Sequence, residues 1–142
     1  MYRTILLAYD GTNYSDVALR QGADLAKACG AQLHLLGVVQ TTGSMAVAEG
    51  MGGQDIWGRE RAHVERSLDA ARTAAAEQGV SAIVTVSEGD PAGEIVRHAQ
   101  SLKADLVVLG HKERGVLASW FGRSVGADLL GSLPCSVLIA TG

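Results

Sequence analysis

The stretch that decides the fold is "EGDPAGEIVRHAQSLKADLVVLG", which runs from Glu88 to Gly110. Asp90 is a good helix N-cap, and Pro91 suits the first position of a helix. The apolar residues that follow recur at helical spacing, at Ile95, Ala99 and Leu102. The stretch ends in an almost continuous apolar run, Asp105–Gly110, which is typical of a strand covered on both faces of a parallel sheet. It therefore predicts a helix that leads into a buried parallel strand.

Four more apolar runs on either side of this stretch have the length of strands. They are "TILLAYD" (Thr4–Asp10), "QLHLLGVV" (Gln32–Val39), "AIVTVS" (Ala82–Ser87) and "SVLIAT" (Ser136–Thr141). Helical patterns separate the runs, with apolar stripes at 18–29, at 64–75 and, in a short fourth helix, at 125–130. Gly30 and Gly79 follow the first two stripes and predict where those helices end. Strands and helices thus alternate from the first strand to the fifth.

This alternation predicts an α/β fold in which one doubly wound domain spans residues 1–142. We expect a Rossmann-like, five-stranded parallel sheet of order 3-2-1-4-5 with two helices on each face. The glycine-rich segment Thr41–Gly58 has no clear period and is interpreted as a mobile loop. Trp57 is either an anchor for that loop or the first core contact of the next helix.

Composition narrows the possible functions. Hydrophobic residues make up 47% of the chain and charged residues 19%, which is typical of a globular protein. The net charge of −3 and the few aromatic residues argue against binding to nucleic acid or to a membrane surface. The first apolar run is too short for a signal peptide or a membrane span, so we expect a cytoplasmic protein. Cys29 and Cys135 match no metal-binding spacing and are interpreted as small buried hydrophobic residues rather than a disulfide.

The predicted strand order also predicts where a ligand binds. In doubly wound sheets, ligands bind beyond the carboxyl ends of the strands, at the point where the strand order reverses. In the order 3-2-1-4-5 that point lies between the first and fourth strands. The first strand ends at Asp10 and Gly11, and the fourth ends at Leu109 and Gly110. We therefore expect a binding crevice between these two ends.

The residues expected around this crevice suit a nucleotide. Asp10 can accept hydrogen bonds from an adenine amino group or a ribose, and Gly110 allows a phosphate to approach the backbone closely. Ser124 and Val125 open the short fourth helix, whose N-terminus attracts phosphate. Lys112, Arg114 and Arg123 add positive charge, and Gly89 ends the third strand near the same edge.

Each of these features also has a plain structural explanation. Asp10 with Gly11 makes a good turn, or Asp10 caps the first helix. Asp90 with Pro91 is a normal helix start, and the basic residues would suit a solvated surface. Only their convergence on one edge of the sheet favours a functional interpretation.

The chain resembles the universal stress proteins over essentially its whole length. The resemblance rests on "ILLAYDG" near the start, on the stretch quoted first, and on "ALRQGADLAKACGAQLHLLGVV" and "LLGSLPCSVLIA". Members that bind ATP share the loop G-x2-G-x9-G-[S/T] after the fourth strand. Here Gly110 and Ser124 fit that pattern, whereas Glu113 and Arg123 replace its second and third glycines, with Gly122 one position early.

The resemblance implies a set of ligands and contacts. It implies that ATP binds, with any Mg²⁺ arriving with the nucleotide, and that Asp10 and Val38 lie at the adenine and Gly89 near the ribose. The residues that it implies at the phosphates are Gly110, Arg123, Ser124 and Val125. It further implies a homodimer in which the last strand, Cys135–Thr141, pairs with its counterpart. We also expect a protein partner of unknown identity.

The sequence contains no persuasive catalytic set. It lacks the Walker pattern, and its four histidines form no metal-ligand spacing. His111, beside the crevice, would contact a phosphate, shuttle a proton or be an ordinary polar loop residue. At most we expect slow ATP hydrolysis. Two hypotheses follow: an ATP-binding sensor that regulates a stress response, or a dimeric adaptor that does not bind ATP and acts through protein partners.

Overall fold

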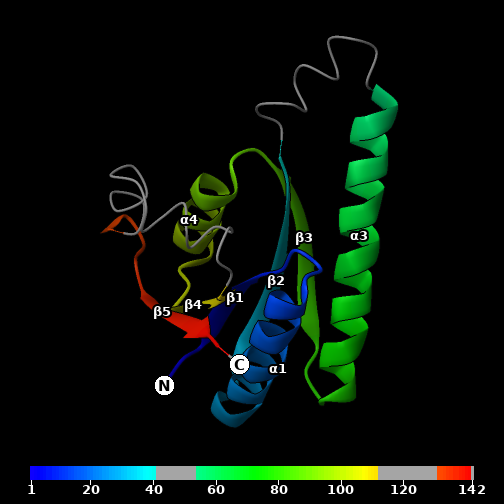
Figure 1. Cartoon of the computed structure of the whole chain (residues 1–142). Helices are drawn as coiled ribbons and strands as arrows, with labels where there is room; N and C mark the ends of the chain where they lie inside the picture. The colour runs from blue at the N-terminus through cyan, green and yellow to red at the C-terminus, as the bar shows by residue number, and fades with distance from the viewer. Residues whose placement is uncertain (41–53, 112–130, 142) are drawn as a thin grey trace.

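The computed structural model of the chain describes residues 1–40, 54–111 and 131–141 (Figure 1). Its strands are β1 (Thr4–Ala8), β2 (Gln32–Val39), β3 (Ala82–Glu88), β4 (Leu106–Gly110) and β5 (Ser136–Ala140). The helices in this part of the chain are α1 (Asn13–Cys29), α3 (Gln54–Glu77) and α4 (Pro91–Leu102). The strands agree with the predicted apolar runs to within two residues at either end.

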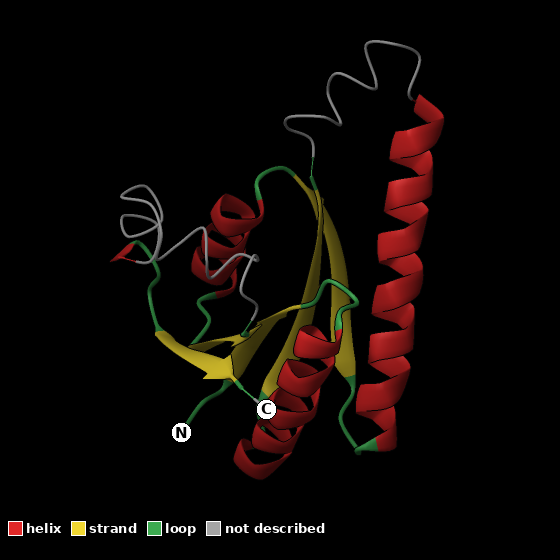
Figure 2. Ribbon diagram, in the orientation of Figure 1, coloured by secondary structure: helices red, strands yellow, loops and turns green. Residues whose placement is uncertain are grey.

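The five strands form one sheet in the order β3-β2-β1-β4-β5, and all neighbouring strands are parallel (Figure 2). This confirms the predicted strand order and the Rossmann-like α/β class. Because every strand runs in the same direction, the carboxyl ends of all five strands lie at one edge of the sheet.

Two apolar clusters form the core, one on each face of the sheet. On one face, side chains of α1 and α3 such as Ala18 and Leu68 pack on Ile5, Leu7 and Leu35. On the other face, α4 packs through its buried stripe; this cluster contains Leu6, Leu36, Ala92, Ile95, Ala99, Val107 and Leu109. The alternation of facing residues along β1 therefore divides the core between the two layers.

The predicted number of helices on each face needs correction. Among the residues that the structure describes, one face carries α1 and α3, whereas the other carries α4 alone. The predicted fourth helix, at 125–130, lies outside the described residues.

The start of α3 also differs from the prediction. The helix begins at Gln54, so the last residues of the segment interpreted as a loop are helical. The segment 54–58 contains no proline, and Gly58 is exposed, with open space where a Cβ would lie. A single exposed glycine weakens a helix by about 1 kcal/mol but does not break it. Residues 41–53 and the side chain of Trp57 lie outside the described part of the chain.

All three described helices end by the same device, a residue in the left-handed conformation. These residues are Gly30 (φ 65°), Gly79 (φ 87°) and Lys103 (φ 53°). In each case the next amide donates to a carbonyl five residues earlier: Ala31 to Ala26, Val80 to Ala75 and Ala104 to Ala99. This pairing is the Schellman motif, and each motif leads directly into a strand. The ends predicted at Gly30 and Gly79 are thus confirmed.

The two cysteines are free, so the prediction that no disulfide joins them is confirmed. Each is half-buried rather than fully buried. Cys29 is the last residue of α1 and Cys135 immediately precedes β5, so both lie at the ends of elements, where the packing is less complete.

Candidate functional site

The reversal of strand order lies between β1 and β4, as the sequence predicts. Leu7 of β1 is the register partner of Val108 of β4, and Ala8 is the partner of Leu36 of β2. Two residues further along are Asp10 and Val38. The ends of β1, β2 and β4 therefore lie next to one another at one edge of the sheet.

Asp10 is exposed at the end of β1. Its Oδ1 accepts hydrogen bonds from the Thr12 amide at 3.0 Å and from the Thr12 hydroxyl at 2.6 Å. The N-cap of α1 is Thr12, whose hydroxyl oxygen accepts from the Ser15 amide at 3.3 Å. The alternative in which Asp10 itself caps the helix is therefore wrong, because Asp10 instead orients the residue that does.

Gly110, at the end of β4, lies directly against the first turn of α1. A Cβ on this residue would collide with the carbonyl group of Tyr14 and would come within 3.0 Å of the Ser15 nitrogen. Sequence reasoning missed this contact. The contact explains why position 110 holds a glycine, because a side chain there would collide with the helix. The predicted contact of Gly110 with a phosphate stays a prediction.

Val38 and Gly89 lie together at the ends of β2 and β3. Val38 is half-buried and is the register partner of Ser87. The Gly89 amide donates to the carbonyl oxygen of Val39 at 3.0 Å, and its φ of 143° favours glycine. The structure thus gathers four of the predicted site residues, Asp10, Val38, Gly89 and Gly110, at one edge of the sheet. Arg123, Ser124 and Val125, like Lys112, Glu113 and Arg114, lie outside the described residues.

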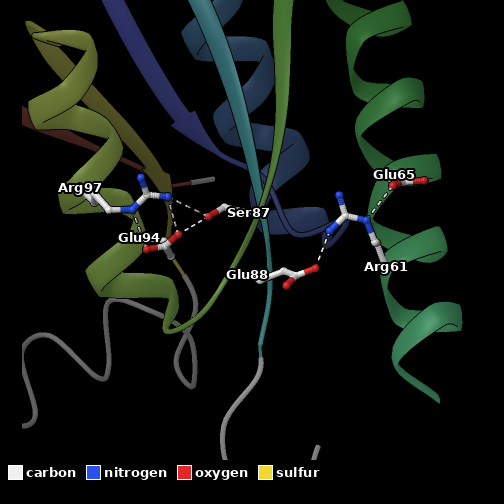
Figure 3. A network of polar contacts seen from close by, with 6 residues as sticks. All are labelled: Arg61, Glu65, Ser87, Glu88, Glu94 and Arg97. Carbon is white, nitrogen blue, oxygen red and sulfur yellow. Dashed lines mark hydrogen bonds and ion pairs between the residues drawn. The ribbon is translucent and has the colours of Figure 1, made fainter. Parts of the chain in front are cut away.

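A polar network that sequence reasoning missed lies beside Gly89 (Figure 3). The Ser87 hydroxyl donates to Oε1 of Glu94. Arg97 donates to both oxygens of Glu94, through Nε at 3.0 Å and through Nη2 at 2.8 Å. Its signal in the sequence is the i, i+3 spacing of Glu94 and Arg97, one turn into the helix that Asp90 caps.

The hydrogen bonds of this network favour the ionised form of the Glu94 carboxyl group. The hydrogen bonds from Arg97, together with that from Ser87, lower the pKa of Glu94 to about 2, against the opposing effect of burial. Glu94 is therefore ionised throughout the neutral range. A second ion pair, between Arg61 of α3 and Glu88 at 2.6 Å, joins the end of β3 to α3, which packs on the face of the sheet opposite to α4 (Figure 3).

His34 and His111 lie at different parts of the sheet. His34 is buried in β2, where burial lowers its pKa and its Nε2 lies 2.9 Å from the Gln32 side-chain oxygen. The His111 amide donates to the Ala140 carbonyl at 3.0 Å, which places His111 just after β4 and beside the end of β5. Among the residues described, no group of three His, Cys, Asp or Glu side chains is arranged to hold a metal ion.

Within the described ranges, every helix is too short or too polar to cross a membrane.

Comparison with known proteins gives a consistent result. The model of the universal stress protein family matches residues 1–141. The universal stress protein YxiE of Bacillus subtilis is 32% identical over 147 residues, which cover 98% of this chain and 99% of that protein. A solved structure of a universal stress protein family member from Burkholderia pseudomallei is 27% identical, with a TM-score of 0.75 over 97% of this chain and 95% of that one.

A further solved structure is described as a universal stress protein in complex with cAMP. It is 23% identical, with a TM-score of 0.69, and the match covers 99% of this chain and 97% of that chain. At this identity the likeness is one of fold.

Proposed function

Because the chain belongs to the universal stress protein family, whose model matches residues 1–141, we propose that it is an ATP-binding regulator of a stress response. In this proposal it acts in the cytoplasm as a homodimer and passes its state to a protein partner. ATP binds in the crevice beyond β1 and β4 and brings any Mg²⁺ with it.

One observation supports the proposal: the predicted nucleotide contacts lie at the carboxyl ends of four neighbouring strands, and two of these strands, β1 and β4, flank the point where the strand order reverses. Asp10, Val38, Gly89 and Gly110 follow or end β1, β2, β3 and β4. Asp10 is exposed and offers a carboxylate to an adenine amino group or a ribose hydroxyl. The carboxyl edge of a parallel sheet is where α/β proteins bind nucleotides. The complex of a solved relative with cAMP supports the same class of ligand.

The phosphate end of the site is part of the proposal. We assign Arg123, Ser124 and Val125 to the phosphates together with Gly110. Arg123 replaces a glycine of the family loop, and its guanidinium can bind phosphate directly. Glu113 would repel a triphosphate unless Mg²⁺ lies between them.

The homodimer is proposed to form through the last strand, Cys135–Thr141. In the described chain β5 pairs only with β4, so its other side is an edge of the sheet. Its side chains Val137, Leu138 and Ile139 are half-buried. Pairing the same strand of two copies across a two-fold axis removes this edge.

Two contacts favour a second candidate function, a dimeric adaptor without ATP. The Asp10 carboxylate already accepts two hydrogen bonds from Thr12. The glycine at position 110 is explained by its contact with Tyr14. Under this hypothesis the crevice residues are structural, and only the dimer and the partner surface matter.

Calorimetric titration with Mg-ATP, after removal of any nucleotide that copurifies, tests the proposal. The unaltered protein is expected to bind saturably, and Asp10→Ala to bind at least about tenfold more weakly, because a charged hydrogen-bond acceptor is lost. Asp10→Ala also disturbs the cap of α1, so Thr12→Ala is the matched control. It removes the cap, at about 1 kcal/mol of stability, but keeps the carboxylate and should keep binding.

The opposite results would favour the adaptor. If the unaltered protein neither binds Mg-ATP nor releases nucleotide on denaturation, the ATP proposal is wrong. An Asp10→Ala variant that binds normally would instead show that the adenine end has been assigned to the wrong residue.

A further inference from the structure

Glu94, in the first turn of α4, is a largely buried carboxylate side chain. Only 16% of its side chain is exposed, against 61% for its partner Arg97. The side chain folds back over Gly89, so that a Cβ on Gly89 would lie 3.2 Å from the Glu94 Cγ and 3.4 Å from its Cδ. Glu94 therefore fills the space beside the glycine and covers the turn that leaves β3.

Two partners hold Glu94 in this place. The Ser87 hydroxyl donates to Oε1, and the Arg97 guanidinium donates to both carboxylate oxygens (Figure 3). Ser87 is buried and is a fixed part of β3, while Arg97 lies one turn further along α4. An arginine that donates to both oxygens fixes the orientation of a carboxylate as well as its charge.

The turn that Glu94 covers is tied to the predicted sugar and base contacts. The Gly89 amide donates to Val39 at 3.0 Å, and Ser87 is the register partner of Val38. The φ of 143° at Gly89 lies in a region that few residues adopt, so the turn depends on its surroundings to keep this shape. A continuous set of contacts thus runs from Arg97 through Glu94 and Gly89 to the end of β2.

We infer that Glu94 is a positioning residue for the nucleotide site: held by Arg97 and Ser87, it keeps the Gly89 turn in the shape that receives the ribose. The inference rests on the proposed function, because it assumes that a nucleotide occupies this edge of the sheet. Glu94 uses both oxygens within the protein, so its role is to support the turn rather than to bind the ligand.

The first experiment compares Glu94→Gln with the unaltered protein by titration with Mg-ATP and with adenosine. We expect both ligands to bind about tenfold more weakly to the variant, because the defect lies at the sugar end and does not involve phosphate. The loss should be equal at pH 6 and pH 8, since the carboxylate is ionised at both. Asp69→Asn is the matched control: it breaks the exposed i, i+3 ion pair with Arg72 on α3 and should leave binding unchanged.

The second experiment needs no ligand. Hydrogen exchange of the Gly89 amide, which donates to Val39, should be about tenfold faster in Glu94→Gln and in Arg97→Gln. The Gly79 amide is the internal control, because it donates to Ala76 in another turn with positive φ and does not contact Glu94. A general loss of stability would accelerate both amides.

The outcomes separate the two proposals. If Glu94→Gln binds both ligands as tightly as the unaltered protein, or if its Gly89 amide exchanges no faster, the inference is wrong while the proposed function stands. If the unaltered protein binds neither ligand, the proposed function and the inference fall together. In that case faster exchange at Gly89 would assign Glu94 to the stability of the fold alone.

Discussion

Gly110 is a residue at which the sheet lies directly against the backbone of the first helix. Its Cα faces the carbonyl group of Tyr14, and this geometry leaves no room for a side chain. The same residue ends β4 at the reversal of strand order. The absence of a side chain at this position thus allows the end of β4 and the start of α1 to lie in contact beside the proposed crevice.

Replacement of this glycine tests that contact. Gly110→Ala is expected to lower the free energy of unfolding by about 1–3 kcal/mol, because backbone atoms of α1 cannot move aside as a flexible side chain would. Urea denaturation measures the change. Gly58→Ala is the matched control, since a Cβ there meets open space. An alanine in an exposed helix should add about 0.5–1 kcal/mol of stability. Equal effects of the two substitutions would contradict the packing role of Gly110.

At the residue scale, sequence alone could predict features whose cause is local. Asp90 accepts from the Gly93 amide at 3.0 Å, as an N-cap does, and both partners lie within four residues of each other. The contact of Gly110 with Tyr14 could not be predicted, because the two residues are far apart in sequence and glycine has several uses. The Ser87–Glu94–Arg97 network could not be predicted for a similar reason. The contact between Ser87 and Glu94 depends on the conformation of the turn at Gly89.

At the scale of elements, α3 rests on β2 at a point where the sheet has no side chain. A Cβ on Gly37 would lie 2.7 Å from the Cδ1 of Leu68 and 2.7 Å from the Cγ1 of Val64. Leu68 is fully buried in the cluster on this face. The glycine therefore lets two large side chains of the helix reach the sheet.

A double-mutant cycle measures this fit. Gly37→Ala should cost about 1–3 kcal/mol by overpacking, and Leu68→Ala about 2–5 kcal/mol by leaving a cavity. The double variant should lose less than the sum of the two, because the new methyl group enters the space that leucine leaves. The free energies of unfolding in urea give the coupling. Strict additivity would mean that the two residues do not share this space.

The boundaries of the elements were less predictable than their existence. The apolar runs identified all five strands, since strands buried on both faces need apolar residues at nearly every position. The start of α3 was missed because glycine-rich composition suggested a loop through Gly58, whereas an exposed glycine is compatible with a helix. The positions that place residues at the site, the strand ends, were predicted to within two residues.

For the whole molecule, the proposed dimer depends on the side of β5 that pairs with no strand in the described part of the chain. The Ala140 carbonyl accepts from the His111 amide, so the backbone groups of Ala140 face β4. Backbone groups alternate in direction along a strand, and those of Val137 and Ile139 therefore face away from β4. These are the groups that a second copy would pair with.

A proline at one of these positions separates the dimer from the fold. Val137→Pro removes an amide that faces away from β4, and proline is tolerated on edge strands for this reason. We expect the variant to be a folded monomer, as measured by light scattering and circular dichroism, while Val137→Ala remains a dimer. A Val137→Pro variant that stays dimeric would show that the two copies meet elsewhere.

The architecture as a whole was the most predictable level. Alternation of elements and the usual handedness of crossovers predict a parallel doubly wound sheet, for which 3-2-1-4-5 is a common strand order, and none of this depends on any single side chain. The place of the crevice then follows from the order. The ligand of the crevice does not follow from the strand order, because Asp10 and Gly110 each have a structural role as well as a proposed role in binding.

The three Schellman motifs at Gly30, Gly79 and Lys103 have a consequence for protein engineering. They lie where the chain enters β2, β3 and β4, so one rim of the domain consists of hydrogen-bonded closures. The opposite rim holds Asp10, Val38 and Gly89. A library intended to change ligand preference can randomise the second rim and leave the first untouched. The one exception on the first rim is Lys103, where glycine would adopt the left-handed backbone conformation more readily.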